Sequence, residues 1–259
     1  MCKILLTVLI VIVSFLLLVV VGIGAYVLYL LVRRPLVKFY NQRASESDFC
    51  PYDKIPAQLL YFIVQAEDEH FFSHRGIVLD SIQTAFRLNK RAHHIVMGGS
   101  TISQQLMKNL YFQFEQRYFR KLIEAILTFH AERVLGKEKI LELYLNIIYF
   151  GNGQYGIVSA ADYYFNKSVD ELSTNQQFML ACIIHAPNVA NPIKHPDVFL
   201  RVREKKLGVL VRRKTISDSD RQIIQSYDAN CLDPELRPCG EIESRSTDTI
   251  VLVNERFGL

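Results

Sequence analysis

The sequence predicts a mainly α-helical fold with one membrane-spanning helix at the N-terminus. Half of the 259 residues are hydrophobic, while only 12 are glycine and 8 are proline, so residues that interrupt helices are scarce. Apolar residues recur at helical spacing in several stretches, and no charged residue occurs between Ile4 and Val32. A chain of this length can hold one domain plus an anchor, or two small domains.

The formal charge of +4 is mildly basic. Such a balance suits an acidic lipid surface or a phosphorylated ligand. Basic and aromatic residues form no repeating pattern, so nucleic acid is not an expected partner.

The uncharged run from Ile4 to Val32 is the first predicted element. At about 1.5 Å per residue, a helix of this length crosses the roughly 30 Å hydrocarbon core of a bilayer. A cleaved signal peptide is the alternative, but its apolar core would normally be about 7 to 15 residues long and end at a small-x-small site, which is missing here. We therefore assign residues 1–33 to a transmembrane anchor and residues 34–55 to a linker.

The charges beside this run do not favour an outside location for the body of the protein. Lys3 precedes the run, whereas several basic residues follow it, namely Arg33, Arg34, Lys38 and Arg43. The positive-inside rule alone would place the body in the cytoplasm. Outside the cytoplasm, the same residues would bind anionic headgroups or lipid-linked phosphates. Both topologies remain open on charge alone.

A helix is predicted after Pro56, where Leu59, Leu60 and Ile63 recur at helical spacing. It leads into the run AEDEHFFSHRG, which begins at Ala66 and combines carboxylates, imidazoles and aromatic rings. This run is the most conspicuous polar cluster of the chain and the first candidate site.

Glu67 and Asp68 would point about 100° apart on that helix, so they are not expected to share a proton. His70 and His74 lie near the Glu67 face if the helix continues, which raises the possibility of a zinc site. The zincin pattern, however, places its glutamate directly after the first histidine, where this chain has Phe71. A capped helix end whose histidines bond loop carbonyls is the plainer alternative.

The next stretch, RLNKRAHHIVMGGSTISQQLMKN, begins basic and loop-like and then becomes helical. Gly98 and Gly99 break the chain, and Ser100 or Thr101 can cap a new helix. That helix would carry amide and ammonium donors at Gln104, Gln105, Lys108 and Asn109. A helix N-terminus with hydroxyls and a following lysine can bind a pyrophosphate or a sugar. A generic polar helix would contain the same residue types.

A long helical region follows, RKLIEAILTFHAERVLGKEKILELYLN, with an interruption near Gly136. A buried apolar stripe is predicted on it, formed by Leu122, Ile126 and Phe129. Lys121 and Glu124 lie together on another side, and periodicity alone favours a surface pair worth a few tenths of a kcal/mol. Two more helices are predicted between the loop GNGQYG and the segment HAPNVANP.

The five cysteines give little information about function. Cys2 lies at the membrane edge, and Cys182 lies in an apolar stretch where a buried thiol is expected. Cys50, Cys231 and Cys239 lie outside the apolar segments. In an oxidising compartment Cys231 and Cys239 would close a small loop, and the bridged and free forms are equally open.

Taken together, these runs resemble the peptidoglycan glycosyltransferases of glycosyltransferase family 51, in the family's order. The motifs are EDEHFFSHRG (67–76), GGSTISQQLMKN (98–109), RKLIEA (120–125) and KEKILELYLNIIYFGNGQYG (137–156), followed by AADYYFNK and HAPNVANP. The resemblance implies a lysozyme-like, mainly helical glycosyltransferase domain at residues 56–200, with a membrane-proximal lobe. Residues 201–259 remain a C-terminal extension of unassigned role.

The resemblance also implies an activity, which is polymerisation of lipid II into β-1,4-linked glycan strands. A lipid-linked nascent glycan is the donor, the anomeric carbon is inverted, and undecaprenyl pyrophosphate leaves. Glu67 matches the general base of the acceptor hydroxyl. Lys121 matches the contact to the pyrophosphate, and Glu124 assists its departure directly or as the ligand of a divalent ion.

The family implies no tightly bound cofactor, and Mg²⁺ or Mn²⁺ is the expected divalent ion. Further substrate-site positions match Asp68, Phe71, His74, Ser100, Thr101, Gln104, Gln105, Lys108, Asn109 and Arg120. Val78 replaces the family's usual acidic residue, and Gln176 and Gln177 replace a common Glu-Ala pair, which puts a helix contact in doubt but not the chemistry.

No Ser-x-x-Lys and no Lys-Thr-Gly occurs in the 259 residues, so transpeptidase activity is not expected. The resemblance implies a single-pass protein of the bacterial inner (cytoplasmic) membrane, with its catalytic domain outside the cytoplasm and with other cell-wall synthesis proteins as partners. Two alternatives remain, namely a lysozyme-like enzyme that cleaves glycan and a catalytically silent scaffold.

Overall fold

The computed structural model describes residues 2–92, 98–112, 120–226 and 232. Within these ranges the protein is helical, and only an isolated bridge between Tyr149 and Tyr155 has β geometry. The predicted mainly α fold is therefore confirmed. The α-helices are α1 (Cys2–Arg33), α2 (Leu36–Ala44), α3 (Ala57–Glu67), α4 (Leu79–Ala92), α5 (Ile102–Tyr111), α6 (Arg120–Val134), α7 (Gly136–Ile147), α8 (Ile157–Phe165), α9 (Thr174–Ile183), α10 (Pro196–Arg212) and α11 (Asp218–Gln225), and the short 3₁₀ turns are η1 (Tyr52–Lys54) and η2 (Val169–Glu171).

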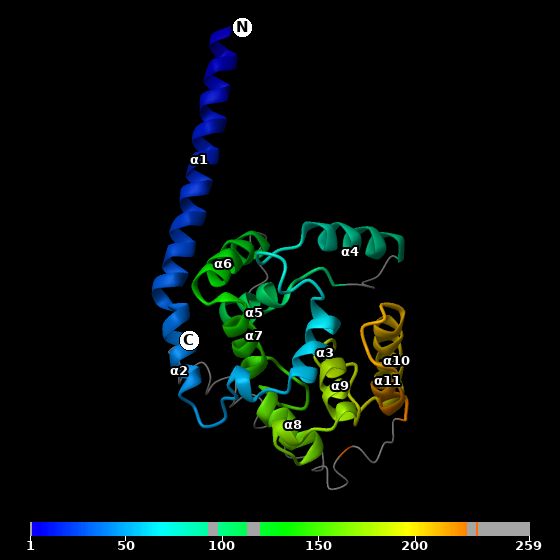
Figure 1. The fold of residues 1–259 in the computed structure, drawn as a ribbon. Helices are drawn as coiled ribbons and strands as arrows, with labels where there is room; N and C mark the ends of the chain where they lie inside the picture. The colour runs from blue at the N-terminus through cyan, green and yellow to red at the C-terminus, as the bar shows by residue number, and fades with distance from the viewer. Residues whose placement is uncertain (1, 93–97, 113–119, 227–231, 233–259) are drawn as a thin grey trace.

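Helix α1 extends from the domain as one long rod (Figure 1). It is the described helix that is long and apolar enough to cross a membrane, and its apolar window is exposed throughout. The predicted N-terminal apolar helix is thus present. A surface of this kind, with Leu, Val and Ile on every side, is stable in hydrocarbon rather than in water.

The base of α1 is fastened to the end of α5. The Arg34 guanidinium donates a hydrogen bond of 2.8 Å to the carbonyl of Leu110, and the Tyr111 hydroxyl donates one of 2.8 Å to the carbonyl of Arg34. The first bond satisfies a carbonyl near the C-terminus of α5, and the second satisfies the carbonyl of Arg34, directly after α1. The end of α1 therefore joins the helix that carries Gln105 and Lys108.

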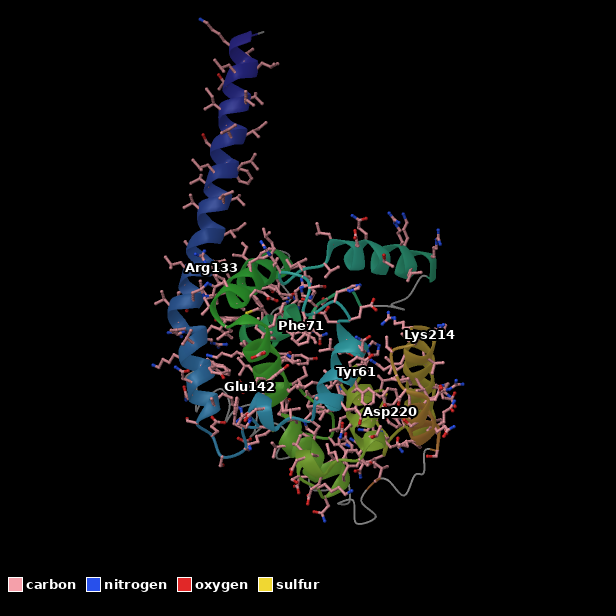
Figure 2. All side chains as sticks on the ribbon, viewed as in Figure 1. Tyr61, Phe71, Arg133, Glu142, Lys214 and Asp220 are labelled. Atoms are coloured by element: carbon pink, nitrogen blue, oxygen red, sulfur yellow. The ribbon has the colours of Figure 1, made fainter. Side chains whose placement is uncertain are left out.

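The predicted linker is ordered and lies against α7. Glu142 of α7 accepts hydrogen bonds from the Tyr40 hydroxyl at 2.5 Å and from the Tyr52 backbone N–H at 2.7 Å. Figure 2 shows Glu142 on the side of α7 that faces the linker. The buried Arg43 donates a hydrogen bond to the Asn146 carbonyl at 3.0 Å. Buried polar groups of the linker are thus paired, which fixes the linker to the domain.

Helix α3 packs against α9 at the centre of the domain (Figure 1). Leu59, Phe62 and Ile63 are fully buried, and the rings of Phe62 and Phe178 meet edge to face at 5.3 Å between centroids. The helix predicted after Pro56 is confirmed. It ends at Glu67, so α3 carries that carboxylate at its C-terminal end.

The interruption predicted near Gly136 is confirmed, since α6 ends at Val134 and α7 begins at Gly136 with φ of 75°. The predicted buried stripe on α6 is wrong, because its side chains are 49%, 38% and 54% exposed at Leu122, Ile126 and Phe129 respectively. Positions 123, 127 and 131 are buried instead. Helix α6 is apolar on two sides, and it lies beside α1 (Figure 1).

The basic stretch predicted to be loop-like is helical from Arg87 to Ala92, as the second half of α4. Neither glycine nor proline occurs between Leu79 and Ala92, and leucine, arginine, lysine and alanine are good helix formers. Leu79 at its start is 69% exposed, and α4 lies apart from the central helices (Figure 1). Residues 93–97 lie outside the described ranges.

Helices α10 and α11 pack on α9, and α10 crosses the predicted domain boundary at residue 200. The Tyr61 hydroxyl of α3 donates a hydrogen bond of 2.5 Å to the carbonyl of Thr215, and the Gln58 amide donates one of 3.1 Å to Asp220 (Figure 2). The first part of the predicted extension is therefore joined to the helix that carries Glu67.

The buried thiol predicted at Cys182 is confirmed, and burial raises its pKa to about 12. Cys50 is also a buried free thiol. Cys231 and Cys239 lie outside the described residues, so their bridge stays a prediction.

Gly151 is expected to be intolerant of a side chain. Its φ is 83°, and a Cβ atom there would lie 2.6 Å from the carbonyl oxygen of Pro187. Gly151→Ala should therefore lower the free energy of unfolding by about 1–3 kcal/mol in chemical denaturation. Gly98→Ala is the control, because nothing lies within 4 Å of its Cβ position. Equal stability of the two variants would contradict the packing of this loop.

Candidate active site

Glu67 ends α3, where the helix dipole disfavours a negative charge. Three hydrogen-bond donors from other parts of the chain offset this unfavourable effect on the Glu67 carboxylate. Gln105 Nε2 lies 3.2 Å from Oε2, while His185 Nδ1 and Lys206 Nζ lie 3.3 Å and 3.2 Å from Oε1. Lys206 also donates to the carbonyl of Ala66 at 3.2 Å. The Glu67 side chain is only 7% exposed, so these donors act where water screens them weakly.

The pKa of Glu67 lies below its ordinary value. Burial is the largest single effect and would raise this pKa, but it is outweighed by the hydrogen bond and charge of His185, the charge of Lys206 and the hydrogen bond of Gln105. Glu67 is therefore ionised at neutral pH. It can accept a hydrogen bond from an approaching hydroxyl and then its proton.

Asp68 is turned away from this cluster. Its Oδ2 atom bonds to His74 Nε2 at 2.9 Å and accepts a hydrogen bond of 3.0 Å from the Ile102 backbone N–H. Because the Gly76 N–H donates to His74 Nδ1 at 2.9 Å, Nε2 carries the imidazole proton. Glu67 and Asp68 face different partners, as expected for residues that share no proton.

The zinc interpretation gains no support from the fold. Helix α3 ends at Glu67, so His70 and His74 do not continue its face. Among the described residues, no group of three or more His, Cys, Asp and Glu side chains is placed to hold a metal ion. A divalent ion at Glu124 would thus take its other ligands from substrate phosphates and water, as Mg²⁺ often does.

Several predicted substrate-site residues are buried, and their polar groups bond within the protein. Thr101 caps α5: its hydroxyl accepts the Gln104 N–H at 3.2 Å, and the Gln104 side chain accepts the Thr101 N–H at 3.1 Å. The Thr101 hydroxyl also donates to the Gly76 carbonyl at 2.5 Å. Phe71 is fully buried beneath Lys137, whose Nζ lies 4.4 Å from the ring centroid. The residues of this buried group are Asp68, Phe71, His74, Thr101 and Gln104.

Lys121 and Glu124 form the second polar centre, at the start of α6. The Lys121 ammonium bonds to the Glu124 carboxylate and, at 3.0 Å, to the Ser100 hydroxyl. Glu124 is 1% exposed, whereas the Lys121 side chain is 53% exposed. The pair expected from periodicity is present, but its carboxylate is buried. It holds an exposed cation in place beside the loop that precedes α5, an arrangement suited to an anionic ligand.

The remaining predicted residues lie on the same two helices. Lys108 is exposed and Asn109 is half-buried on α5, while Arg120 is half-buried at the start of α6. The first motif and α6 meet at Gly76, where a Cβ atom would lie 2.8 Å from the Thr128 side chain. Together with the bonds from Thr101 to Gly76 and from Lys121 to Ser100, this contact places the first motif, the start of α5 and α6 beside one another.

Residues 33–212 match the family model whose description is Transglycosylase. The chain belongs to the transglycosylase family. Penicillin-binding protein 1A of Aquifex aeolicus is 46% identical over 151 residues, which are 58% of this chain and 21% of that protein. Penicillin-binding protein 4 of Bacillus subtilis is 34% identical over 207 residues, or 80% of this chain and 32% of that protein.

A Cupriavidus necator protein that carries transglycosylase in its name is 36% identical over 187 residues, which are 72% of this chain and 78% of that protein. The chain thus resembles this transglycosylase-family relative over most of both lengths. It spans between about a fifth and a third of the two penicillin-binding proteins, at 21% and 32%.

Sequence reasoning missed two partners of Glu67. His185 lies in the segment HAPNVANP, which was matched without a role for this residue. Lys206 lies beyond residue 200, but within the part of the chain that matches the transglycosylase family. Neither residue stands in a local pattern that indicates a contact with a carboxylate in α3.

Proposed function

We propose that this protein is a peptidoglycan glycosyltransferase that polymerises lipid II into β-1,4-linked glycan strands, with inversion at the anomeric carbon. The observation that carries the proposal is the pair of polar centres. One holds the ionised Glu67 among three donors, and the other holds the exposed Lys121 on the buried Glu124. A glycosyl displacement needs a base at one end of the reacting bond and a cation at the other.

In this proposal Glu67 accepts the proton of the acceptor's 4-hydroxyl while that oxygen attacks the anomeric carbon of the lipid-linked donor. The bond to the donor's pyrophosphate breaks, and undecaprenyl pyrophosphate leaves toward Lys121. Glu124 keeps the ammonium of Lys121 in position through the bond between them. Lys108, exposed on α5, adds a second positive charge for the phosphates.

We further propose that the site works at the surface of the inner membrane, with α1 as a single-pass anchor and the domain outside the cytoplasm. Helix α6 lies beside α1, and its exposed apolar side chains would enter the bilayer, where a lipid-carried substrate resides. A C-terminal fusion to a reporter enzyme that is active only outside the cytoplasm tests the topology. A well-expressed but inactive fusion would contradict it.

Incubation of the purified full-length chain with labelled lipid II tests the activity. Polymer formation is expected, and parallel reactions with Mg²⁺, Mn²⁺ or a chelator show whether a divalent ion contributes. Shortening of preformed glycan without polymerisation would instead indicate a lysozyme-like cleaving enzyme. Absence of turnover under all of these conditions would indicate a scaffold.

Replacing Lys206 with methionine is expected to raise the pKa of Glu67, because it removes a positive charge that lowers this pKa. Glu67 is ionised above its folded pKa and loses its charge as the pH falls through that value. The variant should therefore lose activity at a higher pH than the wild type. Initial rates of polymer formation between about pH 4 and about pH 8 measure this shift. Lys205→Met is the control, because Lys205 is an exposed residue of the same helix. If the acid limb of the pH–rate profile, where activity falls with falling pH, is identical in the wild type and both variants, the role of Lys206 is contradicted.

A further inference from the structure

Tyr144 of α7 is fully buried, and its hydroxyl contacts Gln105, which bonds to Glu67. It donates a hydrogen bond of 3.0 Å to Gln105 Oε1, and Gln105 Nε2 donates one of 3.2 Å to Glu67 Oε2. A chain of hydrogen bonds thus runs from α7 through α5 to the carboxylate at the end of α3. The proposed reaction does not use Tyr144.

The direction of this chain follows from the chemistry of its members. A glutamine side chain has a carbonyl oxygen at one corner and an NH₂ group at the other, and the two can exchange places by rotation. Only the NH₂ group can bond to an ionised carboxylate, so the oxygen must find a donor on the opposite side. The Tyr144 hydroxyl is that donor.

Tyr144 is well suited to remain a donor. Burial, together with the negative charges of Glu67 and Asp68, raises its pKa well above the ordinary value for tyrosine. The hydroxyl therefore keeps its proton at neutral pH, where Glu67 is ionised. The Gln105 amide cannot itself pass a proton along the chain, so the effect of Tyr144 on Glu67 is one of orientation and hydrogen bonding.

We propose that Tyr144 is a positioning residue for the reaction, because its hydroxyl holds the NH₂ group of Gln105 against the Glu67 carboxylate. This inference rests on the proposed function, in which Glu67 is the base. With Oε2 occupied in this way and Oε1 facing Lys206 and His185, the plane of the carboxylate is fixed before the acceptor arrives. Preorganisation of this kind raises kcat rather than substrate affinity.

Tyr144→Phe tests the proposal, because it removes one oxygen and keeps the ring in the core. We expect kcat for polymerisation to fall about fivefold, the equivalent of one hydrogen bond of about 1 kcal/mol, with KM unchanged. The acid limb of the pH–rate profile should also move to higher pH, because the hydrogen bond from Gln105 lowers the pKa of Glu67. An acid limb that coincides with the wild type would overturn the proposal.

Tyr164→Phe is the matched control. Tyr164 is another fully buried tyrosine, and its hydroxyl donates a hydrogen bond of 2.8 Å to the carbonyl of Phe150, away from Glu67. It should lower the melting temperature without moving the acid limb. Equal limb shifts in both tyrosine variants would mean that Tyr144 acts on overall stability alone, and would overturn the proposal.

Gln105→Ala provides a second, independent measurement, since it leaves Tyr144 intact. It should move the acid limb in the same direction, and adding Tyr144→Phe to it should cause no further change. A further fivefold loss in the double variant would show that Tyr144 does not act through Gln105. A Glu67→Gln variant measured in parallel distinguishes a failure of the proposed function from a failure of this inference. An active Glu67→Gln variant would show that Glu67 is not the base. An inactive Glu67→Gln variant together with an unaffected Tyr144→Phe variant would rule out only the role of Tyr144.

Discussion

Replacing Glu67 with glutamine is expected to abolish glycan polymerisation while leaving the protein folded. The amide has the size of the carboxylate but cannot accept the proton of the acceptor hydroxyl. Loss of a general base typically costs about 10²–10⁴-fold in rate. The rate of polymer formation from labelled lipid II measures the effect, and circular dichroism with thermal unfolding checks the fold. Binding of lipid II should persist, because Lys121 and Lys108 lie elsewhere in the site.

Glu69→Gln is the control for this variant. Glu69 lies on the same segment, is partly exposed and forms an ion pair of 2.6 Å with Arg213. A partly exposed pair of this kind contributes little to stability, so polymerisation should stay near the wild-type rate. Near-normal turnover in Glu67→Gln, or equal losses in both variants, would remove Glu67 as the base.

Glu124→Gln is expected to reduce polymerisation by at least about 10²-fold, the scale on which a lost charge-stabilising group slows a reaction. The substitution removes the buried negative charge that holds the Lys121 ammonium, which also bonds to Ser100. Without this partner the ammonium is free to leave the position at which the pyrophosphate develops its charge. Single-turnover rates with labelled lipid II, with and without Mg²⁺, provide the measurement.

Two further variants help to interpret the rate measured for Glu124→Gln. Lys121→Met removes the cation itself and should be impaired to a similar degree, whereas Glu138→Gln changes an exposed carboxylate on α7 and should be neutral. Appreciable turnover in Glu124→Gln would mean that Lys121, or a divalent ion held by the substrate, manages the leaving group without it. Rates that respond to Mg²⁺ in the wild type but not in Glu124→Gln would place the ion at this carboxylate.

The features that sequence predicted well depend on local signals. The spacing of Leu59, Leu60 and Ile63 predicted α3. The two hydroxyl residues after Gly98 and Gly99 predicted a cap by Ser100 or Thr101, and Thr101 provides it. Gly136, with its positive φ, separates α6 from α7 as expected. In each case the residues that determine the structure lie within a few positions of one another, so the local sequence is sufficient to predict it.

The contacts that sequence could not predict are set by tertiary packing. Lys206 reaches Glu67 across 139 positions, because α10 lies against α9 and α9 against α3. On α6, two sets of apolar residues have helical spacing, and periodicity cannot tell which of them faces the core. The helices packed against α6 decide which set is buried, and that information lies outside α6 itself.

The reciprocal bonds between Arg34 and the end of α5 have a mechanical consequence. A flexible tether would let the domain move up and down and tilt relative to the membrane surface. Each incoming lipid would then meet the site at a different height above that surface. Here two hydrogen bonds join Arg34, which follows α1, to the end of α5, so in the proposed arrangement the point where α1 leaves the bilayer would set the height of Lys108 above it. In the proposed membrane arrangement, the N-terminal helix would therefore hold the Lys108 ammonium at the level of the phosphates of membrane lipids.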